Sequence, residues 1–202
     1  MKKTLLLCLF AMLGLCVSAQ TSSQAMKVLD KTAAIVGRKG GAQANFVISS
    51  SKIGSQSGTI AIKGDKFQAC TKKAIVWYNG KTQWSYLKLT NEVNISTPNE
   101  AKRMSMNPYT FLSMYKNGYD LSMTKSGSNY VVHMTAQNKK RSVQEVYITI
   151  NKHSYTPSNV RMKQGKEWTT IKVSGFKATN QPDSKFTFNA KDFPKADVID
   201  LR

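Results

Sequence analysis

The chain has 202 residues, of which 30 are lysine or arginine and 11 are aspartate or glutamate, so its formal charge is +19 at pH 7. Hydrophobic residues make up 41% of the chain, which is enough for one domain with a sizeable core. The positive charge implies attraction to polyanions, but the lysines are scattered and form no dense block, so a nucleic-acid site is not expected. A solvated surface is the simpler interpretation, and an anionic membrane surface or an acidic partner stays open.

The first 19 residues are typical of a secretory signal peptide. Two lysines precede an apolar run from Leu5 to Val17, and small residues lead to a cleavage site after Ala19. The run is too short for a transmembrane helix, which needs about 20 apolar residues. The mature chain is then expected to be a single exported domain of residues 20–202 with a formal charge of +17, and no later segment is apolar enough to span a bilayer.

The cysteines leave one alternative for the N-terminus. Cys8 and Cys16 lie in the signal peptide, so Cys70 remains alone, cannot form an intramolecular disulfide and is expected to be a small buried hydrophobe. A lipid-anchored form would need Cys16 as the mature N-terminus, although Leu15 stands where such sites have a small residue. The intact mass separates the two forms, because a chain that starts at Gln20 carries no anchor.

One helix is expected directly after the signal. Its apolar residues recur at the three-and-four spacing of a helix face: Met26, Leu29, Ala33 and Val36. Gly37 and the pair Gly40-Gly41 are expected to end the helix.

From Ala44 onward the hydrophobic period changes to two, which predicts β-strands. Strands are expected around residues 44–48, 59–63, 75–86, 91–96, 129–135, 146–150, 160–164, 169–173 and 185–188. Turn signals rich in glycine, proline, serine and asparagine separate them, which is typical of an antiparallel, meandering sheet. Because one face is apolar, the other is polar and cationic, and few helices are available as cover, the sheet should curl into a half-open β-barrel. The predicted class is therefore mainly β with some α (α+β).

Residues 75–86, IVWYNGKTQWSY, form the clearest hairpin signal. Asn79-Gly80 predicts a type I′ turn, with Tyr78 opposite Lys81. Side chains directly opposite each other share a face, so an aromatic wall is expected on one side: Ile75, Trp77, Trp84 and Tyr86. This wall either packs a core or lines a ligand cavity.

A second short helix is expected over residues 108–116, between strands. Asn107-Pro108 provides a cap and a proline at the first helical position, and Asn117-Gly118 ends the segment. Its apolar side chains, with two methionines just before it, are candidates for a lid: Met104, Met106, Phe111, Leu112, Met114 and Tyr115. Methionines accept varied apolar partners, although they also fill gaps in ordinary cores.

Little in the chain points to catalysis. His133 falls on the outward side of a strand and His153 lies in a turn, and neither belongs to a metal-binding spacing. No nucleophile elbow or phosphate-binding loop is present, and the acidic residues are dispersed. We therefore expect a binding protein without catalytic residues, metal or cofactor.

Four segments together resemble the periplasmic outer-membrane lipoprotein carrier family (LolA-like). They are GTIAIKGDKF, WYNGKTQW, the helix start NPYTFLSMYKNGYDL, and the closing KFTFNAKDFPKADVIDL. The resemblance covers nearly all of the mature chain. One departure is Gly64, which stands where well-studied members carry an arginine that holds the lid closed.

The resemblance implies a monomeric periplasmic carrier with a half-open barrel, helices as a lid, and an apolar cavity for the acyl chains of lipoproteins or other lipids. It also implies an inner-membrane transporter as donor and an outer-membrane acceptor. The sheet lining is expected to include Phe46, Ile48, Ile60, Ile62, Ile75, Trp77, Trp84 and Tyr86. An envelope sensor or structural module on the same scaffold is the alternative.

Overall fold

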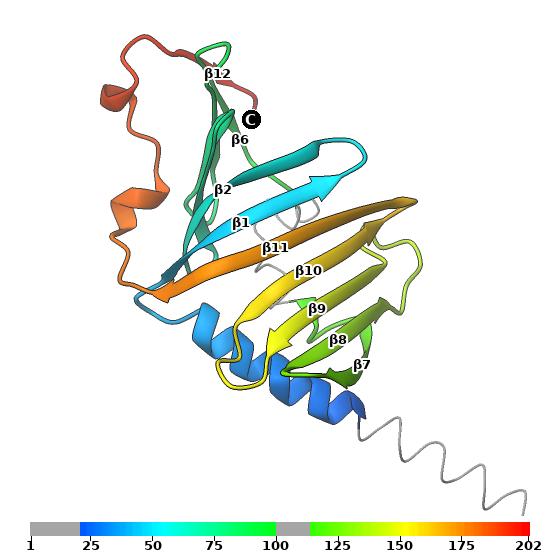
Figure 1. Ribbon diagram of the computed structural model, residues 1–202. Helices are drawn as coiled ribbons and strands as arrows, with labels where there is room; N and C mark the ends of the chain where they lie inside the picture. Colours follow the sequence, from blue (N-terminus) through cyan, green and yellow to red (C-terminus); the bar gives the residue numbers. More distant parts are fainter. Residues whose placement is uncertain (1–20, 100–113) are drawn as a thin grey trace, which may run out of the picture.

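Figure 1 shows the computed structural model of the chain, which describes residues 21–99 and 114–202. A helix covers residues 21–36 and precedes the strands. The strands and 3₁₀ helices are β1 (Ala42–Ser50), β2 (Gly54–Lys63), β3 (Lys66–Thr71), β4 (Ala74–Tyr78), β5 (Gln83–Leu87), β6 (Glu92–Ser96), β7 (Tyr119–Ser126), β8 (Asn129–Ala136), β9 (Glu145–Asn151), β10 (Pro157–Gln164), β11 (Glu167–Ala178), η1 (Asp183–Phe186), η2 (Ala190–Asp192) and β12 (Asp197–Asp200).

All described strands join one sheet in the order β12-β6-β5-β4-β3-β2-β1-β11-β10-β9-β8-β7. Neighbours pair antiparallel, except that β12 lies parallel to β6. The predicted mainly β class is confirmed as a single open, curled sheet (Figure 1), while its closure into a half-open barrel stays a prediction. The sequence analysis did not predict β3, β7 or β12, and β12 lacks the alternation of a half-buried strand because all four of its residues are exposed.

The predicted N-terminal helix is confirmed, but its buried face differs by about one residue from the expected one. Ala25, Val28, Leu29, Thr32 and Val36 are buried, whereas Met26 is 43% exposed. The Thr32 hydroxyl donates to the Val28 carbonyl at 3.0 Å, so a polar residue can occupy the buried face without an unpaired group. The prediction for Met26 was wrong because it set the apolar face by Met26 and Ala33, whereas the face that is buried contains Ala25, Val28 and the hydrogen-bonded Thr32.

Gly37 ends this helix as expected. Its N–H donates to the Ala33 carbonyl at 2.8 Å. A Cβ atom on residue 37 would lie only 2.8 Å from that same oxygen, so a larger residue could not approach this closely.

The main core lies between this helix and the concave face of the sheet. The pairing register places alternate residues of neighbouring strands on the same side, so Ile60 lies beside Ala44 and Ala69. Across the sheet, Val132, Ile148, Val160 and Ile171 continue this face and are at most 2% exposed. The alternation of apolar residues in the sequence of β8 to β11 therefore correctly predicted which side chains face the core.

The tip of the β4–β5 hairpin differs from the predicted type I′ turn. Tyr78 pairs with Gln83, not Lys81, so the loop contains four residues, 79–82. Gly80 has a φ of +99°, but Asn79 is outside the positive-φ region that a type I′ turn requires at both positions. Instead, the Asn79 side chain accepts hydrogen bonds from the backbone N–H groups of Lys81 and Thr82, at 3.0 and 2.9 Å. This Asx turn favours the longer loop.

The closing KFTF segment is not the strand that its alternating phenylalanines predicted. Residues Asp183–Phe186 form η1, and the chain from β11 to β12 runs along the side of the sheet that faces away from the helix (Figure 1). Phe186 is fully buried, and η1 packs against β3 and β4. The apolar residues of this segment therefore cover the sheet instead of extending it.

Candidate functional site

The eight sheet residues expected to line one cavity lie on two opposite faces. Phe46, Ile48, Ile60 and Ile62 face the helix and belong to, or pack against, the main core. Ile75, Trp77, Trp84 and Tyr86 lie on the outer face, because their neighbours Val76 and Tyr78 occupy the concave side. The interpretation of this aromatic wall as part of the concave lining is therefore corrected.

The C-terminal segment covers the outer aromatic wall. We call Phe186, Phe188 and Phe193 the C-terminal clamp. The ring of Trp77 lies 5.6 Å from that of Phe188 and 5.5 Å from that of Phe193, and Tyr86 lies 4.6 Å from Phe193. Trp77 is only 5% exposed, so the wall is the centre of a second, smaller core. No periodicity in the sequence could show which segment would cover it.

The predicted lid is only partly within the described residues. Met104, Met106, Phe111 and Leu112 lie outside them. Met114 and Tyr115 are buried in the main core at 6% and 2% exposure. The Tyr115 hydroxyl donates to the Asp30 carboxylate of the N-terminal helix, and burial together with that carboxylate raises the pKa of Tyr115. This contact ties the end of the 108–116 region to the helix.

A cavity of about 250 Å³ opens between the N-terminal helix and the β7–β8 end of the sheet. Its apolar lining comes from Val28 on the helix, Met123 on β7 and Tyr130 on β8, with Tyr155 from the loop between β9 and β10. Met123 and Tyr130 face the core and are only partly buried. The described residues thus leave part of the concave apolar surface open to solvent.

Three lysines stand at the rim of this cavity: Lys27, Lys31 and Lys125. All three are exposed, and among the described residues none forms a salt bridge. Lysine stems can lie along apolar surface while the ammonium groups stay in water. The opening therefore combines an apolar interior with a cationic entrance, which suits a molecule with a hydrocarbon tail and an anionic or polar head.

Tyr155 lies over this cavity in a conformation that is unusual for a bulky residue, with a φ of +52°. Its backbone N–H donates to the Asn151 carbonyl at 2.9 Å, and the Asn151 side chain accepts from the N–H groups of His153 and Ser154. The ring lies 6.2 Å from that of Tyr130, and Lys31 lies 4.7 Å from its centroid. The turn thus holds the ring at the cavity mouth. The sequence identified the turn around His153 but gave no signal for the ring position.

The concave face becomes polar on β5 and β6, where Gln83, Ser85, Asn94 and Ser96 occupy the positions that are apolar elsewhere. Gln83 is 2% exposed, and its amide nitrogen donates to the Ser85 hydroxyl at 2.9 Å. Its Oε1 accepts no hydrogen bond from any residue that the structure describes. The concave surface is therefore amphiphilic, not uniformly apolar.

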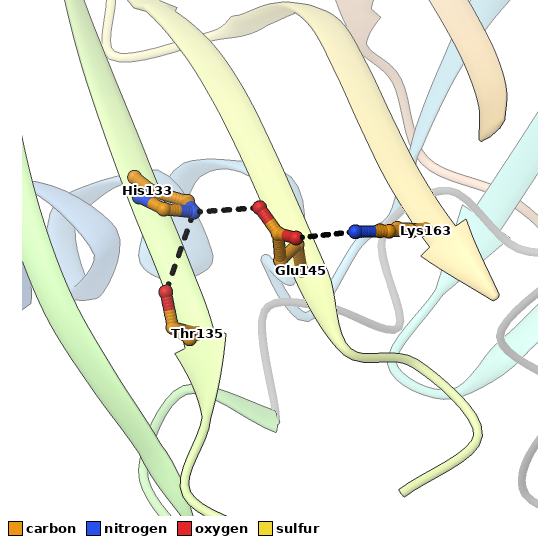
Figure 2. Close-up of polar contacts among 4 residues, drawn as sticks. All are labelled: His133, Thr135, Glu145 and Lys163. Carbon is orange, nitrogen blue, oxygen red and sulfur yellow. Dashed lines mark hydrogen bonds and ion pairs between the residues drawn. The ribbon is translucent and has the colours of Figure 1, made fainter. Parts of the chain in front are cut away.

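A polar cluster on the outer face contains the histidine that the sequence placed outside the core (Figure 2). His133 Nε2 lies 3.4 Å from Glu145 Oε2 and 3.3 Å from Thr135 Oγ1, and Lys163 Nζ lies 2.9 Å from Glu145 Oε1. The His133 ring also stacks on Tyr147 at 4.1 Å. Because the hydroxyl and the carboxylate meet the same ring nitrogen, the histidine cannot relay a proton between them as a nucleophile–base–acid triad does.

This cluster gives a testable pH dependence. The hydrogen bond from Lys163 lowers the pKa of Glu145, so the ionised carboxylate stabilises the fold above its unfolded pKa and this contribution is lost as the pH falls through the folded pKa. We expect Glu145→Gln to remove about 0.2–1 kcal/mol at pH 7, with the difference from the parent shrinking once the pH falls below the ordinary glutamate pKa of about 4.3 and vanishing below the lowered folded pKa. Urea unfolding followed at several pH values measures it, and a difference that grows in acid would contradict the assignment.

Two further findings concern membranes and metals. Within residues 21–99 and 114–202, no helix is both long and apolar enough to cross a membrane. In the same residues, no group of three or more histidine, cysteine, aspartate or glutamate side chains could hold a metal ion. Cys70 is partly buried on the outer face of β3, and burial raises its thiol pKa.

The fold and the cavity define a class of binding protein in which a helix covers part of the apolar concave face of a curled sheet. The chain belongs to the family of the outer membrane lipoprotein carrier protein LolA, whose family model matches residues 15–166. This match confirms the family resemblance seen in the sequence. No curated protein matches the chain.

Solved structures are similar to this chain at low sequence identity. An uncharacterized conserved protein from Thermus thermophilus is 17% identical, with a TM-score of 0.58 over 88% of this chain and 99% of that one. A DUF1329 family protein from Desulfovibrio piger is 12% identical, with a TM-score of 0.51 over 84% and 98%. A LolA superfamily protein from Nitrosomonas europaea is 11% identical, with a TM-score of 0.44 over 81% and 97%.

Proposed function

We propose that this protein is a non-enzymatic periplasmic carrier that shields the acyl chains of lipoproteins. The observation that carries the proposal is the cavity between the N-terminal helix and β7–β8, with Val28, Met123 and Tyr130 inside and three lysines at its rim. Membership of a lipoprotein-carrier family supports the same function. In this proposal the chain is exported by its signal peptide, and cargo moves from an inner-membrane transporter to an outer-membrane acceptor.

The physical need for such a carrier follows from the hydrophobic effect. An acyl chain exposed to water costs about 0.8 kcal/mol for each CH₂ group, so a lipoprotein cannot cross an aqueous compartment unshielded. Burial against Met123 and Tyr130 removes part of that cost. The binding stays reversible because the cavity is open at one side and no covalent step is needed.

Gly64 stands where well-studied family members carry an arginine that holds the lid closed. The opening and closing of the cavity in this chain must therefore be controlled by other residues. Gly64 lies in the two-residue turn between Lys63 and Lys66, with a φ of +60° and no heavy atom of the described residues within 4 Å of a Cβ position. A turn side chain here would point into open space. We propose that, in place of an arginine at this turn, two other groups hold the helix against the sheet. They are the hydrogen bond from Tyr115 to Asp30 and the ring of Tyr155 at the cavity mouth.

Binding of an acylated molecule tests the proposal directly. We expect the mature chain, purified from the envelope, to carry bound lipid or lipoprotein in native mass spectrometry. A fluorescent fatty-acyl probe should bind and be displaced by an acylated lipoprotein. Stable capture of a signalling protein without any transfer of cargo between vesicles would favour the envelope-sensor alternative, and no binding of acyl probe or lipid would refute the carrier.

A further inference from the structure

A second cavity lies on the opposite, outer face of the sheet. It has a volume of about 440 Å³, which is within the usual range of small-molecule sites. Its walls come from the outer sides of β1, β2, β3 and β11 and from η1, with Gln43, Asn45, Thr59, Gln68, Lys177 and Lys185 as its polar lining. These residues alternate with Ala44 and Ile60 of the main core, so the sheet separates this cavity from the acyl-chain cavity.

A β-bulge opens the sheet surface at this point. Gln43 pairs with Lys177 and Asn45 with Ser174, so β11 contains one more residue than β1 between the two pairs. Gly175 adopts a φ of +60° within the bulge, and a Cβ atom there would lie 2.8 Å from the Asn45 side-chain nitrogen. The missing side chain at Gly175 therefore helps to keep the cavity open.

Five of the polar side chains that line the cavity have no hydrogen-bond or salt-bridge partner among the described residues, whereas Thr59 hydrogen-bonds the Cys70 thiol. The carboxamides of Gln43, Asn45 and Gln68 make no hydrogen bond there, and Lys177 and Lys185 form no salt bridge. Within residues 21–99 and 114–202, no carboxylate belongs to the lining. A cluster of this kind carries an uncompensated positive charge together with three groups that can each donate and accept hydrogen bonds.

The two lysines of the cavity, Lys177 and Lys185, lie on elements that are packed against the rest of the sheet. Lys177 lies on β11, in the centre of the sheet. Lys185 lies on η1, which is anchored by the fully buried Phe186 and by Asp183, whose carboxylate contacts Lys63 at 3.2 Å and Lys66 at 2.9 Å. Both ammonium groups therefore stand at the cavity without relying on a flexible loop.

We propose that this outer-face cavity binds a phosphorylated polyol of the glycerophosphate class. Two ammonium groups, one from β11 and one from η1, act as point charges, which suits a phosphate. A planar carboxylate favours the fork of an arginine, and no arginine among the described residues lines the cavity. The three carboxamides match hydroxyl groups, because each offers a donor and an acceptor. The same chemistry occurs in soluble glycerol phosphates and in the head group of phosphatidylglycerol.

Two experiments test whether the site binds this ligand class and whether the ligand is soluble or part of a lipid. One is isothermal titration with sn-glycerol 3-phosphate, and the other is flotation with phosphatidylglycerol vesicles compared with phosphatidylcholine vesicles. Binding to the soluble compound alone assigns a metabolite, and binding to the anionic vesicles assigns a lipid head group. We expect Lys177→Ala and Lys185→Ala each to weaken binding about tenfold. Lys172→Ala, on the same face of β11 but outside the lining, should change it less than about twofold.

Three results would overturn the proposal. They are no binding in either arm, an equal loss in Lys172→Ala, and inorganic phosphate binding as tightly as glycerol 3-phosphate. Asn45→Leu checks the polyol part independently, because it should lower the preference for glycerol 3-phosphate over inorganic phosphate without removing either lysine. The fatty-acyl probe should bind all of these variants unchanged, so failure of this site and failure of the carrier function give different results.

Discussion

Replacing Trp77 by alanine is expected to lower the free energy of unfolding by about 3–5 kcal/mol while leaving the affinity for an acyl probe unchanged. Trp77 is 5% exposed, and its ring meets Phe188 and Phe193 of the C-terminal clamp. Its loss leaves a cavity at the centre of the smaller core, on the face of the sheet away from the acyl-chain cavity. Urea denaturation followed by circular dichroism measures the stability, and a probe titration below the transition measures binding.

Trp168→Ala is the matched control for that experiment. Trp168 also lies on the outer face, but its ring is only partly buried and meets the strand neighbours Tyr147, Arg161 and Lys163. Its removal should cost about 1–2 kcal/mol, the range of exposed aromatic and cation–π contacts. If Trp77→Ala instead abolished probe binding at unchanged stability, the aromatic wall would be a ligand site and our placement of the cavity would be wrong.

Replacing Met123 by glutamate is expected to weaken binding of the acyl probe about tenfold or more, equivalent to about 1.4 kcal/mol. Met123 lies on the concave side of β7, where it lines the cavity beside Val28 and Tyr130. A carboxylate at this position must either lose its hydration when an acyl chain binds or keep water in the cavity, and both oppose burial of hydrocarbon. Probe fluorescence titrated at constant ionic strength measures the change.

Thr124→Glu provides the control, because Thr124 is the next residue of the same strand, is exposed and faces outward. It adds the same charge to the protein without entering the cavity, so we expect less than about a twofold change. A second variant, Tyr155→Ala, removes the ring at the mouth from a surface turn and should weaken binding without disturbing the sheet. Parent-like affinity in both Met123→Glu and Tyr155→Ala would exclude this cavity as the acyl-chain site.

In the β4–β5 hairpin, the predicted residue pairing is wrong, but the predicted grouping of side chains on the two faces is correct. The predicted pairing of Tyr78 with Lys81 differs from the observed pairing with Gln83 by two residues. Because side chains alternate with a period of two, a shift of two residues keeps every side chain on its face. Trp77 and Trp84 therefore still share a face, as the sequence indicated, although the turn is of another type.

The same hairpin shows what local pattern cannot decide. Alternation groups Ile75 with Trp77, but it carries no information on which face of a sheet will receive the helix and which will receive the C-terminal clamp. That choice depends on contacts between residues about 110 positions apart, such as Trp77 with Phe188. The apolar cavity residues were not among the predicted site residues for the same reason, since the cavity forms only where the helix and the 151–156 loop meet the sheet; they are Val28, Met123, Tyr130 and Tyr155.

By itself, the sequence determined the periodicities: a helix from residue 21, antiparallel strands with one apolar face, and the motifs that place the chain in its family. These properties depend on neighbours within a few residues, so they can be read from the chain directly. Only the tertiary structure decided which apolar faces meet each other and which stay uncovered. That outcome follows from long-range packing, in which each apolar surface is covered by whichever segment the topology brings to it.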